Sequence, residues 1–281
     1  MTLFLEDSFS LHSIDKQHID SKRLDVYRRN FNWYVATFPQ EKVKVIEGFI
    51  KGLETYSGTN VFNPWRDVDF TLDCAAVAAE IRQNNLMAYL LPRLGRASIF
   101  IVAEAMGYQG GRFTGIAITC ERMLLGLHKT IEARDVTEID LMRTSSITSE
   151  LLKRTQREQG FNEPTDTVVW NVIVEAGLNP YDTLLWNIFP FHPHKRNESL
   201  TNRTPTQEEQ SIGFSYTEQL LAIHKQCGGA EPLVVAVGQK SANTLGSFGL
   251  QAIGLRHPAN GGANLYRQGF KDALRLYDVI G

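Results

Sequence analysis

Short apolar runs alternate along this chain with longer segments in which apolar residues recur at helical spacing. The apolar runs cover residues 98–102, 184–188, 233–237 and 252–255. Helical spacing is found over residues 41–56, 75–91 and 168–176, after the capping-box pair Thr206 and Glu209, and at Tyr266, Phe270, Leu274 and Tyr277. Continuous apolar runs of this length are typical of strands buried on both faces. The alternation therefore predicts a three-layer α/β/α fold with a central, mostly parallel sheet.

The first 70 residues follow a different pattern. They are rich in charged and aromatic side chains and only weakly periodic, apart from the helical segment 41–56. Residues 58–64 combine glycine, asparagine and proline in the manner of a turn. We therefore predict an N-terminal helical extension over residues 1–70 and an α/β domain over residues 71–281.

Composition places the chain among proteins with a large core. It has 281 residues, of which 43% are hydrophobic. It has no apolar run of about eighteen residues, the length that spans a membrane. Residues 1–5 are followed at once by two acids, Glu6 and Asp7, rather than by a signal-peptide pattern. These features predict a soluble cytoplasmic protein without a membrane partner.

The cysteines and the net charge exclude several classes of site. Cys74, Cys120 and Cys227 are odd in number and lack C-x-x-C spacing, so they predict neither disulfides nor a zinc or iron–sulfur site. The formal net charge of −2 gives no global attraction to a polyanion. Any nucleic acid must therefore be held by a local basic face.

Three polar side chains stand where predicted strands end. Glu104 follows the first apolar run, Asn187 lies at the end of the second, and His257 follows the last. In an open parallel sheet, ligands bind outside the carboxyl ends of the strands. The pattern therefore predicts a site built from these three groups.

A glycine-rich segment follows the first of these strands. It has four glycines in the nine residues 107–115. Such a loop lets the backbone approach a ligand closely and direct N–H groups toward it, although a tight crossing loop has the same composition. The spacing matches neither a Walker loop nor G-x-G-x-x-G, which argues against phosphate binding by those two mechanisms.

Basic residues cluster in the loops after the site strands. Those we expect to contact the phosphates of a polyanion are Lys195, Arg196, Arg203 and Arg256, together with Asn260 and Gly261, which precede the last helix. Backbone N–H groups at a helix N-terminus favour an anion, so a phosphate could bind there. Lys240 and Arg267 lie beside the same loops. Taken singly, each of these cations is as well explained by solvated surface charge.

Over roughly residues 75–281 the chain resembles the uracil-DNA glycosylase superfamily. The segment Ala103-Glu-Ala-Met-Gly107, with Gly115-Ile-Ala-Ile-Thr119 behind it, is similar to the first motif of that family, and His257-Pro-Ala259 is similar to the second. Asn187 takes the place of the strand-end asparagine that reads the pyrimidine, and Asn202-Arg203 resembles the loop that follows it.

The resemblance implies a monofunctional glycosylase that flips uracil from DNA and hydrolyses its glycosidic bond during base-excision repair, without metal or organic cofactor. Cleavage of this bond leaves positive charge on the sugar and negative charge on the base. Glu104 could orient a water and offset the sugar charge, and His257 could donate to a base oxygen. Asn187 offers the donor and acceptor that match uracil. Gly107, Tyr108, Gln109 and Ile118 complete the predicted substrate-binding set.

The chain also departs from the family pattern. Met106 stands where proline is usual, and Ile118 stands where many members have a phenylalanine that stacks on the base. Phe113, Tyr108 and Phe189 are the nearest aromatic substitutes in the sequence. Gly107 replaces a tyrosine that blocks a 5-methyl group, which predicts weaker discrimination against thymine.

Two other functions fit the same residues. One is a DNA-binding relative that has lost catalysis, suggested by Met106 and Ile118. The other is a nucleoside- or nucleotide-binding hydrolase with the same sheet, for which a glycine-rich strand-end loop would also serve. His128, His192 and His194 do not form a metal-binding set with any carboxylate, so we interpret them as loop or surface histidines.

Overall fold

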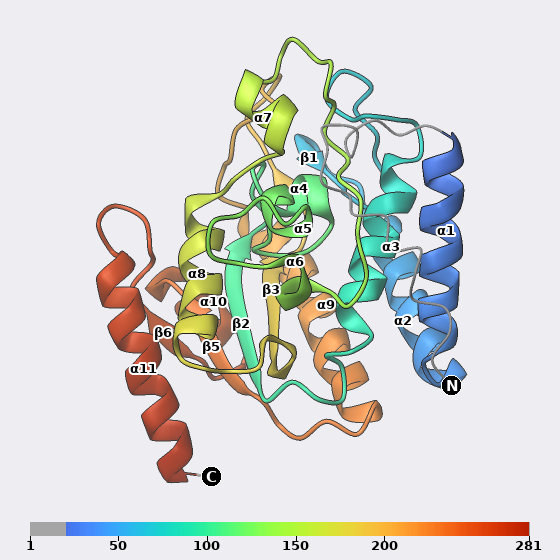
Figure 1. Ribbon diagram of the computed structural model, residues 1–281. Coiled ribbons are helices and arrows are strands. Elements are labelled where there is room, and N and C mark those ends of the chain that lie inside the picture. Colours follow the sequence, from blue (N-terminus) through green and yellow to red (C-terminus); the bar gives the residue numbers. More distant parts are fainter. Residues whose placement is uncertain (1–20, 281) are drawn as a thin grey trace.

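The computed structural model describes residues 21–280, and residues 1–20 of the predicted extension lie outside the described part. A four-stranded parallel sheet forms its centre (Figure 1), with the strand order β3-β2-β5-β6. The strands are β2 (Ile99–Ala105), β3 (Thr183–Phe189), β5 (Leu233–Val237) and β6 (Ile253–Leu255). The apolar runs therefore predicted all four strands, and β2 and β3 extend slightly beyond them.

Helices flank this sheet. The long ones are α1 (Ser21–Ala36), α2 (Gln40–Glu54), α3 (Ala78–Leu90), α8 (Pro164–Glu175), α9 (Gln207–Gln226), α10 (Gln239–Ser247) and α11 (Ala263–Ile280). In Figure 1, α1, α2 and α3 lie at one side of the molecule and α11 at the other. The α/β fold with a parallel sheet is thus confirmed, with N-terminal helices present.

The remaining elements are short. They are β1 (Val61–Phe62), β4 (His192–Pro193), α4 (Gly111–Thr114), α5 (Glu121–Leu124), α6 (Ala133–Val136), α7 (Arg154–Gln159) and the 3-10 helix η2 (Pro180–Asp182). Strands β1 and β4 pair with each other in antiparallel fashion. Our interpretation of His192 as a loop or surface histidine is wrong, because its side chain in β4 is fully buried. Burial lowers the pKa of His192 to about 3, so its ring is neutral.

The N-terminal helices share the hydrophobic core of the sheet. Tyr27 of α1 and Ile46 of α2 belong to the same buried cluster as β2 and β3. Helix α2 packs against α3 and α9, and Phe49 of α2 contacts Trp186 of β3. Tyr89 of α3 accepts a hydrogen bond from the Leu185 N–H of the edge strand β3 at 2.8 Å. These contacts cover an edge that would otherwise present unpaired backbone groups.

Helix α9 begins as its sequence predicts. Thr206 accepts from the Glu209 N–H at 3.1 Å, and the Glu209 carboxylate accepts from the Thr206 N–H at 2.7 Å. This reciprocal capping box fixes the start of the helix after the basic loop. The loop is thereby anchored close to the carboxyl ends of β2 and β3.

Candidate functional site

A cavity of about 730 Å³ opens at the carboxyl ends of the sheet strands. Its walls come from the ends of β2, β3, β5 and β6, from the start of α8 and α10, and from the loop before α9. The predicted site residues that line it are Glu104, Gly107, Ile118, Asn187, Arg203, Arg256 and His257. The structure therefore brings together the three strand-end groups that the sequence singled out.

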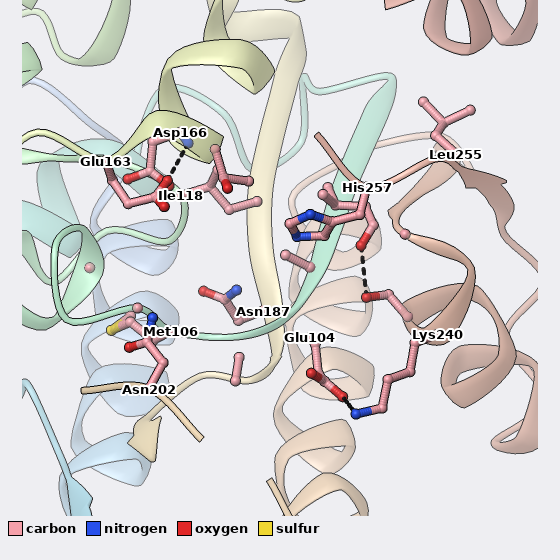
Figure 2. Close-up of a pocket in the computed structure, with 18 of the residues that line it drawn as sticks. Glu104, Met106, Ile118, Glu163, Asp166, Asn187, Asn202, Lys240, Leu255 and His257 are labelled. Atoms are coloured by element: carbon pink, nitrogen blue, oxygen red, sulfur yellow. Dashed lines mark hydrogen bonds and ion pairs between the residues drawn. The ribbon is translucent and has the colours of Figure 1, made fainter. Parts of the chain in front are cut away.

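Asn187 forms the floor of this cavity. It sits inside β3 opposite Ala103 of β2, shortly before the end of the strand. Only 2% of its surface is exposed, and its Oδ1 has no hydrogen-bond partner among the described residues. Figure 2 shows its amide near the centre, between Met106 and His257. A buried amide oxygen without a partner is costly, which is typical of a group reserved for a ligand.

Glu104 lies at the rim of the cavity, near the end of β2. Its carboxylate forms an ion pair with the Lys240 ammonium at 2.6 Å, and Gln210 donates to it at 3.3 Å. Lys240 belongs to the first turn of α10, and its side chain is 58% exposed. No pattern in the sequence indicates that Lys240 pairs with Glu104, because the two stand on different strand-to-helix connections.

His257 follows β6 and faces the same cavity from the side opposite Glu163 and Asp166 (Figure 2). Its Nδ1 accepts from the Ala259 N–H at 3.1 Å, so the proton of the neutral ring lies on Nε2. Burial lowers the pKa of His257, outweighing the opposing effect of Glu163. A neutral ring with a protonated Nε2 can donate a hydrogen bond into the cavity.

The backbone near His257 leaves little space for side chains. Gly238, at φ +96°, lies so close to His257 that an added Cβ would be 3.3 Å from the His257 Cβ. Only glycine adopts this conformation at low cost. The end of β5 thus fixes the backbone beneath the imidazole.

Two residues of the glycine-rich loop do not line the cavity. The Tyr108 ring packs edge-on against Phe161, and the Gln109 amide donates to the Asn162 carbonyl at 3.3 Å. The Tyr108 N–H donates to the Asn202 Oδ1 at 3.0 Å. We predicted that Tyr108 and Gln109 bind the substrate. Their side chains make these contacts in the structure, and substrate binding by this segment stays a prediction.

An aliphatic side chain, Ile118, forms part of the cavity wall. Ile118 lines the cavity at φ +51°, and Trp170 donates to its carbonyl oxygen at 2.9 Å. Neither Phe113, which stacks on Phe161, nor Phe189 lines the cavity, and both rings are fully buried. The wall beside Asn187 is therefore apolar but not aromatic.

Two acidic residues of the cavity were not predicted from the sequence. Glu163 is the N-cap of α8 and Asp166 lies in its first turn, and both line the cavity. The first turn of α8 is polar, so the apolar periodicity detected this helix only from residue 168. A proline at the first helical position, with one acid before it and another in the first turn, is a helix-start signal that could have located both.

The predicted DNA-contacting residues fall into two groups. Lys195, Arg196, Arg256, Asn260 and Gly261 are exposed. Arg203 instead forms a bidentate ion pair with Glu209 at 2.6 and 2.7 Å, which raises the pKa of the guanidinium. The charge of Arg203 is therefore compensated within the protein.

Neither a metal nor a membrane span is indicated for the described part of the chain. Within residues 21–280, no three His, Cys, Asp or Glu side chains are grouped as metal ligands. None of the described helices is both long enough and apolar enough to cross a bilayer.

Comparisons with known proteins agree with the fold. No protein-family model matches the chain. No curated protein matches it either. Among solved structures, it is similar to wild-type SMUG2 from Pedobacter heparinus, with a TM-score of 0.53 and 13% sequence identity. The match covers 83% of this chain and 98% of that one. SMUG2 is a member of the uracil-DNA glycosylase superfamily, and this chain has a uracil-DNA glycosylase-like fold.

Proposed function

We propose that this protein is a DNA glycosylase that hydrolyses the N-glycosidic bond of uracil, and of related deaminated bases, in base-excision repair. The main support is the environment of Asn187. Its buried amide oxygen lacks a hydrogen-bond partner among the described residues, and the side chain lies in one cavity with His257 and Glu104. The similarity of the fold to SMUG2 supports the same class of activity. The enzyme acts as a monofunctional hydrolase, without metal or organic cofactor.

Asn187 supplies base recognition. Its Oδ1 can accept from uracil N3–H and its amide N–H can donate to O4, whereas cytosine presents the opposite pattern. Because the residue is only 2% exposed, water cannot replace a missing base contact. Each group left unpaired costs about 1–3 kcal/mol, so the amide selects strongly for the matching base.

His257 stabilises the leaving base. The C1′–N bond breaks with its electron pair on the base, so negative charge develops on the base oxygens. The Nε2–H of a neutral His257 can donate to one of them, and its orientation is fixed beforehand by the Ala259 N–H. Pre-positioned donors of this kind contribute about 10²–10³ in rate.

Glu104 acts on the sugar and the water. As an anion at the cavity rim it offsets the positive charge that develops on the sugar, and it can accept a proton from the attacking water. Lys240 holds the carboxylate at 2.6 Å. The Lys240 side chain is more than half exposed, so its ammonium can also reach a phosphate of a bound strand.

The DNA backbone contacts the exposed cations at the rim. Lys195, Arg196 and Arg256 supply charge, and the Asn260-Gly261 turn supplies backbone N–H groups before α11. Arg203 has a structural part in this scheme, because its pairing with Glu209 anchors the loop that carries Asn202.

Single-turnover excision from a uracil-containing oligonucleotide tests the assignment. Glu104→Gln and His257→Ala should each lower the rate about 10²-fold or more, while DNA affinity changes far less. Glu175→Gln is a matched control, because Glu175 forms an ion pair with Arg267 away from the cavity. Equal losses of rate and affinity in the two site variants would place Glu104 and His257 at the DNA surface and contradict their catalytic roles.

A further inference from the structure

A second buried polar side chain lines the same cavity as Asn187. Asp166 is 6% exposed, and its Oδ2 has no hydrogen-bond partner among the described residues. It lies with Glu163 on the Ile118 side of the cavity, across from His257 (Figure 2). Capping does not explain this carboxyl group, because Glu163 is the acid that caps α8, accepting from the Asp166 N–H at 2.6 Å.

The surroundings of Asp166 favour its neutral form. Burial raises the pKa of Asp166 well above the ordinary value of 3.8, and the charge of the neighbouring Glu163 acts in the same direction. The titratable groups that face the pair from other elements are Cys120, before α5, and His257, after β6. None of the ion pairs within the described residues involves Asp166 or Glu163, so no cation offsets the negative charge.

The backbone opposite Asp166 is shaped to admit it. Gly110 approaches so closely that an added Cβ would overlap the Asp166 Oδ2. A side chain at this position would push the carboxyl group away from its place at the cavity wall. The glycine of the loop after β2 therefore permits the position of Asp166.

We propose that Asp166 is a base-recognition residue, whose neutral carboxyl group forms a hydrogen bond to the extruded base from the Ile118 side of the cavity. This inference rests on the proposed function. A carboxylic acid has one donor and an acceptor, as the Asn187 amide has. Two such groups select a base that presents carbonyl oxygens and ring N–H groups together along its edge.

Substitutions that separate hydrogen bonding from charge test this role. Asp166→Asn keeps a donor and an acceptor without titrating, whereas Asp166→Leu removes both at similar size. In single-turnover excision we expect Asp166→Leu to be slower by about 10-fold or more and Asp166→Asn to stay near the parent rate. The parent rate should fall as the pH rises and Asp166 ionises, and Asp166→Asn should lack this fall. The matched control is Asp135→Asn, which alters the capping-box acid of α6 outside the cavity.

The remaining outcomes distinguish the ways in which the inference can fail. Parent-like excision by a folded Asp166→Leu variant would overturn the inference and leave Asp166 with a role in stability alone. If Asp166→Asn is as slow as Asp166→Leu, excision requires an ionised carboxylate. That result would overturn the proposal that a neutral carboxyl group donates the hydrogen bond. Calorimetric binding of free uracil separates the inference from the proposed function. If the parent binds uracil, Asp166→Leu does not, and neither excises it, the glycosylase proposal fails while base recognition by Asp166 stands. If the parent neither excises nor binds uracil, both fail.

Discussion

Replacing Asn187 by leucine should raise the stability of the protein while it abolishes excision. The Asn187 Oδ1 is buried at the cavity wall and has no partner among the described residues. A buried polar group left unsatisfied costs about 1–3 kcal/mol, and an apolar replacement removes that cost. For a domain of this size, 1 kcal/mol corresponds to about 2–4 °C in melting temperature. We therefore expect the melting temperature of Asn187→Leu to rise by roughly 2–12 °C.

The same substitution at Asn85 provides the matched control. Asn85 is also fully buried, but its amide donates to the carbonyl oxygens of Thr114 and Met142 at 3.0 and 3.1 Å, and its oxygen accepts from Tyr27. Asn85→Leu leaves those carbonyls unpaired and should lower the melting temperature. Because both side chains are buried, the two substitutions differ in the hydrogen bonds that they remove. The changes in melting temperature should therefore have opposite signs.

Two assays decide this prediction. Thermal unfolding followed by circular dichroism gives the melting temperatures, and single-turnover excision of uracil should fall by about 10² or more in Asn187→Leu. A melting temperature that falls by several degrees in Asn187→Leu, with excision unchanged, would refute the reasoning. It would show that the Asn187 amide is satisfied in the free protein and does not face the base.

Three further predictions concern charge, protonation and space. The double substitution Lys195→Ala/Arg196→Ala should weaken binding to normal and uracil-containing DNA alike. It should also flatten the log–log salt dependence of DNA binding by about one unit for each phosphate that the protein no longer neutralises. An unchanged slope in a salt titration would show that these side chains are only solvated. The pKa of Asp166 is raised in the folded state, so the stabilising contribution of this group is complete below its unfolded-state pKa and is lost as pH rises through its folded-state pKa. Asp166→Asn should therefore gain stability relative to the parent between acid and neutral pH. Melting temperatures that stay parallel over this range would contradict the raised pKa. Gly110→Ala should displace Asp166 and lower both the stability of the protein and its rate of excision. Gly48→Ala, in open space on α2, should instead stabilise the protein by up to about 1 kcal/mol. Equal melting temperatures for the two variants would argue against the close approach of Gly110 to Asp166.

The elements that the sequence predicted well are those with a strong apolar signal. The four strands are continuous apolar runs, and α9 has both a capping box and a buried face. Helix α10 was not predicted, since only Ser241 and Leu245 of its residues are buried and its remaining positions are polar or small. Helix α1 was missed for the same reason, because it buries only Tyr27 and Tyr34.

The candidate site was predictable where it depends on strand ends. Parallel strands end at the same edge of a sheet, so Glu104, Asn187 and His257 had to lie near one another once the sheet was predicted. The ion pair of Glu104 with Lys240 was not predictable, because it depends on how α10 leaves β5. The burial of Phe113 and the position of Asp166 in the cavity wall likewise depend on packing between segments that are distant in the sequence.

Cleavage of the glycosidic bond of uracil in DNA is the activity that we propose for this cavity. The most direct test incubates the parent protein, in excess and without added metal, with end-labelled oligonucleotides containing one uracil or, at the same position, one thymine. Free bases are then identified by mass spectrometry. We expect one equivalent of free uracil and an abasic site that breaks only on alkali treatment, because a monofunctional hydrolase leaves the strand intact. A protein that binds the uracil oligonucleotide but releases no free base would not be a glycosylase.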